Sequence, residues 1–62
     1  MPLVQVSLIE GRPADLKARL IAELTDAVVR VLGAPAESVR VILYDVPTTQ
    51  WGVGGVPKGS EA

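Results

Sequence analysis

Pro2, directly after the initiator Met1, is the residue with the most unusual chemical potential in this chain. Inside a chain the proline nitrogen belongs to a tertiary amide and has no N–H. If Met1 is removed, that nitrogen becomes a secondary amine, which can act as a base or a nucleophile. Desolvation or neighbouring cations would lower the pKa of such an amine and keep it neutral at physiological pH. Pro2 alone is weak evidence, because a single residue is a poor motif.

Two arginine residues stand out by their positions in the chain. Arg12 follows the first predicted strand, and Arg40 interrupts the apolar run of the second one. Long cations are rarely buried without a partner. Arg40 therefore lies either on a solvent-facing side of the sheet or in a pocket that binds an anion. For Arg12 the simpler alternative is a solvated loop cation.

Trp51 is the single tryptophan of the chain and is followed by Gly52-Val53-Gly54-Gly55. It is either a hydrophobic plug at an interface or an apolar wall that keeps water out of a pocket, and the two roles are compatible. The glycine-rich segment is not a phosphate-binding loop, because no Lys-Ser or Lys-Thr follows it and it does not join a strand to a helix.

The composition removes several classes of chemistry. The 62 residues include no cysteine and no histidine, so a catalytic triad has neither a thiol nor an imidazole base. Carboxylates remain as the only strong metal ligands, so we expect no zinc or iron site. A net charge of −1 and only one tryptophan, one tyrosine and no phenylalanine argue against nucleic-acid binding.

Hydrophobicity is high, but its pattern does not predict a membrane protein. The most apolar stretch, residues 20–32, is interrupted by Glu23, Asp26 and Arg30 and is shorter than the span of about 20 apolar residues that a membrane requires. The first residues lack the basic region of a signal peptide. We therefore expect a cytoplasmic protein without a membrane segment.

The periodicity of apolar residues predicts four elements in one domain, residues 1–62. Residues 3–9 and 38–46 alternate as strands, and residues 14–32 follow a helical period with Gly33 at the C-cap. Strand, helix and strand of these lengths form a β-α-β unit with parallel strands and a right-handed crossover. The glycine-rich tail predicts a turn or short hairpin. The fold class is thus α/β (α+β).

Such a unit is too small to be stable alone. The chain is 48% hydrophobic with a mean hydropathy of +0.36, and it has no disulfide to support it. A domain of this size buries only about 60% of the surface of its unfolded chain. A parallel sheet also needs both faces covered. The sequence therefore predicts that several chains associate into a larger sheet.

Four features, in this order, resemble the 4-oxalocrotonate tautomerase family. They are Pro2 at the start of a strand, Glu-Gly-Arg at 10–12, Ser-Val-Arg at 38–40 and Trp-Gly-Val-Gly-Gly at 51–55. The resemblance covers nearly the whole chain. It implies a β-α-β subunit in a homohexamer, a trimer of dimers with active sites at the subunit boundaries.

The resemblance also implies roles for the candidate residues. Pro2 would be the general base, Arg12 would hold a substrate carboxylate, and Arg40 would stabilise a developing enolate oxygen. Trp51 stands where the best-known member has phenylalanine and would form an apolar wall. The implied enzyme is an isomerase of aromatic compound catabolism that needs no metal or cofactor. Its substrate would be a small anionic mono- or dicarboxylate such as 2-hydroxymuconate.

Two alternatives remain open. Some relatives use a protonated proline to add water to haloacrylates and expel halide, although no carboxylate here is an evident activator of water. The other alternative is a non-catalytic oligomer subunit that retains Met1, since fold alone does not fix function. The sequence also leaves open whether the oligomer contains one kind of chain or two.

Overall fold

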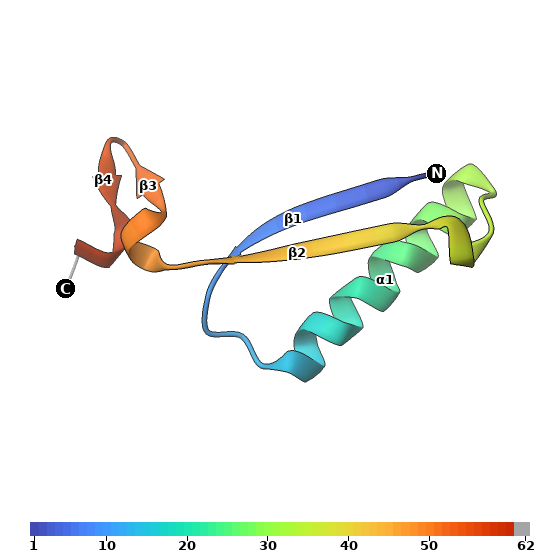
Figure 1. Ribbon diagram of the computed structural model, residues 1–62, viewed down its shortest axis with the longest axis horizontal. Helices are drawn as coiled ribbons and strands as arrows, with labels where there is room; N and C mark the ends of the chain where they lie inside the picture. Colours follow the sequence, from blue (N-terminus) through green and yellow to red (C-terminus); the bar gives the residue numbers. More distant parts are fainter. Residues whose placement is uncertain (61–62) are drawn as a thin grey trace.

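The computed structural model describes residues 1–60, in which one helix crosses between two parallel strands (Figure 1). Strand β1 (Leu3–Ile9) is followed by helix α1 (Ala14–Leu32) and strand β2 (Arg40–Val46). A separate antiparallel pair follows, made of β3 (Gly52–Val53) and β4 (Val56–Pro57). The predicted β-α-β unit with a C-terminal hairpin is confirmed. Residues 61–62 of the predicted domain and tail lie outside the described residues.

The register of β1 and β2 decides which side chains share a face. Leu3 pairs with Arg40 at one end of the sheet, and Ile9 pairs with Val46 at the other. Because side chains alternate along a strand, one face of the sheet is mainly apolar and is covered by α1. The other face is open and contains exposed side chains. The half-buried residues of the helix side are Val4, Val6, Leu8, Val41 and Leu43; exposed residues of the open side are Leu3, Gln5, Arg40, Ile42 and Tyr44.

Helix α1 has the bounds that the sequence predicts. Pro13 occupies the N-cap, and Gly33 occupies the C-cap with φ 68°, where its N–H donates to the Val29 carbonyl oxygen at 3.0 Å. Leu20 and Leu24, in the middle of the helix, are half-buried against the sheet, whereas Leu16 and Val31 near its ends are exposed. No helix within residues 1–60 has the length and hydropathy of a membrane span.

The second strand begins two residues later than the predicted start at residue 38. Residues Ala36–Ser38 form a 3₁₀ turn instead. The Ser38 backbone N–H and hydroxyl both donate to the Pro35 carbonyl oxygen, at 3.0 and 2.7 Å. A serine side chain that bonds to nearby backbone competes with strand pairing. The extended backbone therefore starts only after this turn, at Val39.

The tail hairpin (residues 47–60) folds on itself and projects from the end of β2 (Figure 1). Its two-residue turn consists of Gly54 and Gly55, which have φ of 61° and 85°. Positive φ at both central residues is the requirement of the type I′ turn that favours hairpins, and glycine adopts it without steric cost. The prediction of a hairpin from the glycine run is confirmed.

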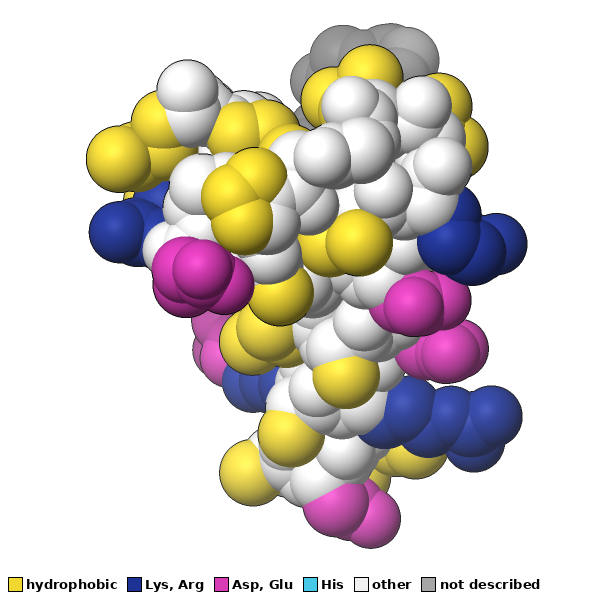
Figure 2. Space-filling view, turned by 90° about the vertical axis from the view of Figure 1, so that its right-hand side faces the viewer, with side chains coloured by type: hydrophobic (Ala, Val, Ile, Leu, Met, Phe, Trp, Pro, Cys, Tyr) yellow, Lys and Arg dark blue, Asp and Glu magenta, His cyan; other side chains and the backbone are white. Residues whose placement is uncertain are grey.

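A single chain buries little. Among the described residues only Val39, at 8% exposure, is buried, while leucine, isoleucine and valine side chains of α1 and both sheets remain exposed. Figure 2 shows hydrophobic side chains at the surface, interspersed with charged ones. Exposed apolar surface of this extent is typical of protein–protein interfaces.

Candidate active site

The amino end of the sheet brings Pro2 and Arg40 together through their backbones. The Arg40 N–H donates to the Pro2 carbonyl oxygen at 2.9 Å, continuing the pairing of β1 with β2 by one residue. Pro2 is half-buried, whereas the preceding Met1 is 87% exposed. The position of the Pro2 backbone is thus fixed by the sheet, while Met1 extends into solvent.

The Arg40 side chain lies on the open face of the sheet. Its guanidinium donates to the Glu37 carbonyl oxygen at 2.7 Å, and Arg40 is exposed. Of the two alternatives left by the sequence, the isolated chain shows the solvent-facing one. The contact between Arg40 and Pro2 is made by backbone atoms. Because the guanidinium itself is exposed, a second chain would have to cover this face to enclose it.

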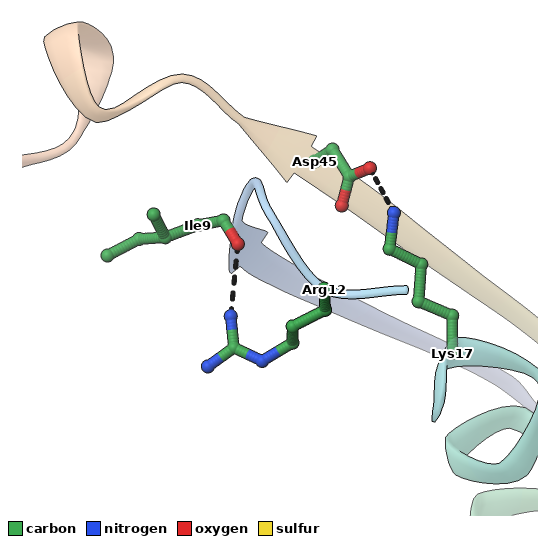
Figure 3. Close-up of polar contacts among 4 residues, drawn as sticks. All are labelled: Ile9, Arg12, Lys17 and Asp45. Atoms are coloured by element: carbon green, nitrogen blue, oxygen red, sulfur yellow. Dashed lines mark hydrogen bonds and ion pairs between the residues drawn. The ribbon is translucent and has the colours of Figure 1, made fainter. Parts of the chain in front are cut away.

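Arg12 lies beyond the opposite, carboxyl end of β1. Its guanidinium donates to the Ile9 carbonyl oxygen at 3.0 Å, which folds the side chain back towards the end of its own strand (Figure 3). The Glu10 N–H donates to the Val46 carbonyl oxygen at 3.0 Å and holds this loop beside the end of β2. Arg12 is exposed, as expected for a loop cation.

Trp51 also lies beyond the carboxyl end of the sheet, because it follows β2 in the tail hairpin. Its backbone N–H donates to the Thr48 carbonyl oxygen at 3.3 Å, and its carbonyl oxygen accepts a hydrogen bond from the Lys58 backbone N–H at 2.8 Å. The side chain is half-buried. Two hydrogen bonds thus fix the Trp51 backbone within the hairpin.

The four predicted site residues therefore lie at two separate ends of the sheet. Pro2 and Arg40 lie at the amino end of the sheet, and Arg12 and Trp51 lie past its carboxyl end. The seven residues of β1 separate the two ends, and at about 3.3 Å per residue this is a distance of about 20 Å. The described part of a single chain encloses no pocket. One small substrate cannot contact all four residues within one chain.

The carboxylates of residues 1–60 do not gather into a group of three that could hold a metal ion. Two of them form ion pairs instead. Asp26 pairs with Arg30 at 3.1 Å along α1, as the spacing of four predicts, and Asp45 pairs with Lys17 between β2 and α1.

The ion pair of Lys17 with Asp45 is the contact that sequence reasoning missed (Figure 3). A signal for it exists in the patterns. Lys17 precedes Leu20 by three and Leu24 by seven residues, on the helix stripe that faces the sheet. Asp45 follows Leu43 by two residues, on the strand face that looks towards the helix. These patterns place opposite charges on two surfaces that face each other, and the placement of α1 on β2 determines that the two side chains meet.

Comparison with known proteins decides the family. The model of the family described as "Tautomerase enzyme" matches residues 2–61. The chain belongs to this tautomerase family. The tautomerases are isomerases, so the predictions of the family and of an isomerase are both confirmed.

The similar proteins are of about the same length as this chain. A probable tautomerase of Ralstonia nicotianae is 62% identical over 60 residues, which are 97% of this chain and 86% of that protein. A 2-hydroxymuconate tautomerase of Comamonas testosteroni is 43% identical over 56 residues, 90% of this chain and 89% of that protein.

Solved structures agree in fold. A 4-oxalocrotonate tautomerase homologue has a TM-score of 0.94 and 45% identity, over 100% of this chain and 98% of that one. A chain of a heterohexamer 4-oxalocrotonate tautomerase from Chloroflexus aurantiacus has a TM-score of 0.92 and 34% identity, over 100% of both chains. The predicted fold class is therefore confirmed on independent structures.

Proposed function

We propose that this protein is a cofactor-free tautomerase in which the Pro2 amine, freed by removal of Met1, is the general base. The observation that carries the proposal is the hydrogen bond between the Arg40 N–H and the Pro2 carbonyl oxygen, which ties the candidate base to the strand of the candidate oxyanion-stabilising arginine. The substrate class is a small unsaturated 2-hydroxy or 2-oxo acid. The 2-hydroxymuconate tautomerase among the relatives supports 2-hydroxymuconate as the first substrate to test.

The reaction moves one proton and changes no other atom. The Pro2 nitrogen takes the proton of the 2-hydroxyl group, and the resulting dienolate spreads its charge over O2, C3 and C5. Arg40 stabilises the charge on the oxygen, and the protonated Pro2 amine returns a proton to C3 or C5. The product is a 2-oxo acid, and the amine is neutral again. A cation that interacts with negative charge formed in the transition state stabilises that state more than the bound substrate, and so lowers the activation barrier.

Removal of Met1 is a requirement of this mechanism. With Met1 attached, the Pro2 nitrogen is an amide and accepts no proton. The 87% exposure of Met1 supports ready access to an aminopeptidase, and loss of this side chain removes no core packing.

The complete site would be built by self-association, which joins the amino end of one chain to the carboxyl end of another. The separation of about 20 Å between the two ends of the strands and the apolar side chains that one chain leaves exposed both support this arrangement. A homohexamer is the assembly we propose, and the hexameric relative supports that number. In such a site Arg12 would bind a substrate carboxylate, and Trp51 would exclude water.

This environment should lower the pKa of the Pro2 amine. Two guanidinium groups near the amine disfavour its protonated form, and an apolar wall adds to the effect by desolvation. A base with a lowered pKa is neutral at pH 7 and can accept the substrate proton. The rate should then fall as pH drops through that lowered pKa, because the amine becomes protonated.

The first experiment measures ketonisation of 2-hydroxymuconate by protein whose intact mass confirms the loss of Met1. The parent should turn over rapidly, with kcat/KM titrating between about pH 5 and 8. Pro2→Ala should lower kcat by about 100-fold or more, the usual scale of general-base catalysis. Its primary amine would account for the residual rate, and the oligomeric size should not change.

Full activity of Pro2→Ala would remove Pro2 as the base. Absence of turnover by the parent with a verified free Pro2 would contradict the proposed substrate. In that case haloacrylates, the substrates of the hydratase-like alternative, are the next to assay. A protein inactive on these as well would favour the non-catalytic subunit. Matched protein that retains Met1 is the control, and it should be inactive.

A further inference from the structure

The ion pair between Lys17 and Asp45 joins α1 to the carboxyl end of β2 (Figure 3). The two residues are 28 positions apart in sequence, whereas the other ion pair of residues 1–60, Asp26 with Arg30, lies within one turn of helix. The side chains of Lys17 and Asp45 are 26% and 43% exposed, so solvent reaches both. Exposed pairs of this kind stabilise a fold only weakly. The location of the pair is therefore more informative than its strength.

That location closes a loop. The Glu10 N–H binds the Val46 carbonyl oxygen, and the Lys17 ammonium binds the Asp45 carboxylate. Residues 10–17 are thus held at both ends by two consecutive residues of β2. Arg12 lies inside this closed segment, next to the N-cap of α1. If the ion pair is broken, the hydrogen bond of Glu10 still holds the start of the segment, but the contact that holds its end at Lys17 is lost.

We propose that the Lys17–Asp45 pair is a positioning device for Arg12. By holding the start of α1 on β2, it limits the conformations of the loop from which the guanidinium projects. A cation that is already placed loses less conformational freedom when it binds an anion. The inference rests on the proposed function in one respect, since it takes Arg12 as the group that binds a substrate carboxylate.

The test is a binding measurement that does not depend on turnover. Adipate is a six-carbon dicarboxylate like 2-hydroxymuconate, but it has no enol and cannot react. Its dissociation constant is measured by calorimetry with the assembled parent, Lys17→Met, Asp45→Asn and the conservative variant Lys17→Arg. Arg30→Gln is the matched control, because it breaks the ion pair that lies within α1. Sedimentation confirms that each variant keeps the oligomeric size of the parent.

Lys17→Met and Asp45→Asn should each weaken adipate binding by about fivefold, the scale of ordering one or two side chains. Combining them should add little, because both remove the same contact. Lys17→Arg and Arg30→Gln should bind like the parent. In an Arg12→Gln background, Lys17→Met should have no further effect, since its action passes through Arg12. With 2-hydroxymuconate, Lys17→Met and Asp45→Asn should raise KM and leave kcat within about twofold, whereas Lys17→Arg and Arg30→Gln should leave both constants unchanged.

Several results would overturn the inference. One is unchanged adipate binding by Lys17→Met, and another is an equal loss in the Arg12→Gln background, which would mean a general effect on structure. Failure of the parent to bind adipate would also overturn it. A parent whose adipate binding depends on Arg12 and on the Lys17–Asp45 pair, but which does not turn over 2-hydroxymuconate, would support the inference and contradict the proposed function.

Discussion

The two ends of the β1–β2 sheet are built by different kinds of contact. At the amino end, backbone hydrogen bonds predominate: Arg40 pairs with Pro2, and the 3₁₀ turn before β2 places Val39, the buried residue, beside them. At the carboxyl end, the backbone hydrogen bond from Glu10 to Val46 is supplemented by two side-chain contacts. Arg12 bonds to Ile9, and Lys17 pairs with Asp45.

This difference agrees with the chemical role proposed for each end. Proton transfer requires the base and the oxyanion-stabilising group to be fixed within fractions of an ångström, and a strand backbone is a more precise support than a loop. Recognition of a carboxylate tolerates a loop, and loops commonly carry binding residues. The comparison predicts that substitutions at the amino end change kcat, whereas those at the carboxyl end change KM.

The largest effect among variants that test this comparison is expected for Arg40→Ala. The variant loses the cation that would meet the developing enolate oxygen, so kcat should fall by about 100- to 1,000-fold. Stopped-flow or steady-state assays with 2-hydroxymuconate measure the change. Arg40→Lys keeps the charge but not the planar fork and should give an intermediate rate. If Arg40→Ala retains its kcat, Arg40 has a structural role only.

Arg12→Ala is expected to have a smaller effect, and to change KM rather than kcat. Loss of a charge-assisted hydrogen bond to a carboxylate should raise KM by about 10- to 100-fold, with a lesser change in kcat. The measurement is a full saturation curve at constant ionic strength, because exposed charges are screened by salt. A fall in kcat with an unchanged KM would show that the two ends are not divided in this way.

The smallest effect should come from Gly59→Ala, which tests how the hairpin positions Trp51. A β-carbon at residue 59 would lie 2.8 Å from the Thr48 hydroxyl oxygen and 3.0 Å from the Thr49 nitrogen, so the hairpin must shift. We expect a changed emission of the single tryptophan and a KM raised by no more than about fivefold.

Gly52→Ala is the matched control for that experiment. A β-carbon at residue 52 meets no atom within 4 Å, so the hairpin has no reason to move. The Trp51 emission of this variant should resemble that of the parent. Equal changes in both variants would mean that the close approach of Gly59 to Thr48 does not control the tryptophan.

Much of the fold could be predicted from local patterns. The alternation in residues 3–9, the helical period in residues 14–32 and the glycine cap gave the observed bounds of β1 and α1, because each depends on nearby residues alone. The predicted start of β2, at residue 38, was two residues too early. The alternation of apolar residues does not reveal that Ser38 forms hydrogen bonds to the Pro35 carbonyl oxygen.

The sequence by itself determined the elements, the candidate residues and the need for other chains to cover the apolar surface. Only the tertiary structure decided which of these residues are neighbours. The parallel register placed Pro2 beside Arg40 and left Arg12 and Trp51 at the far end of the strands. Packing of α1 on β2 likewise brought Lys17 to Asp45. The physical reason is that periodicity describes one element at a time, whereas a contact between elements depends on their register and relative placement in space.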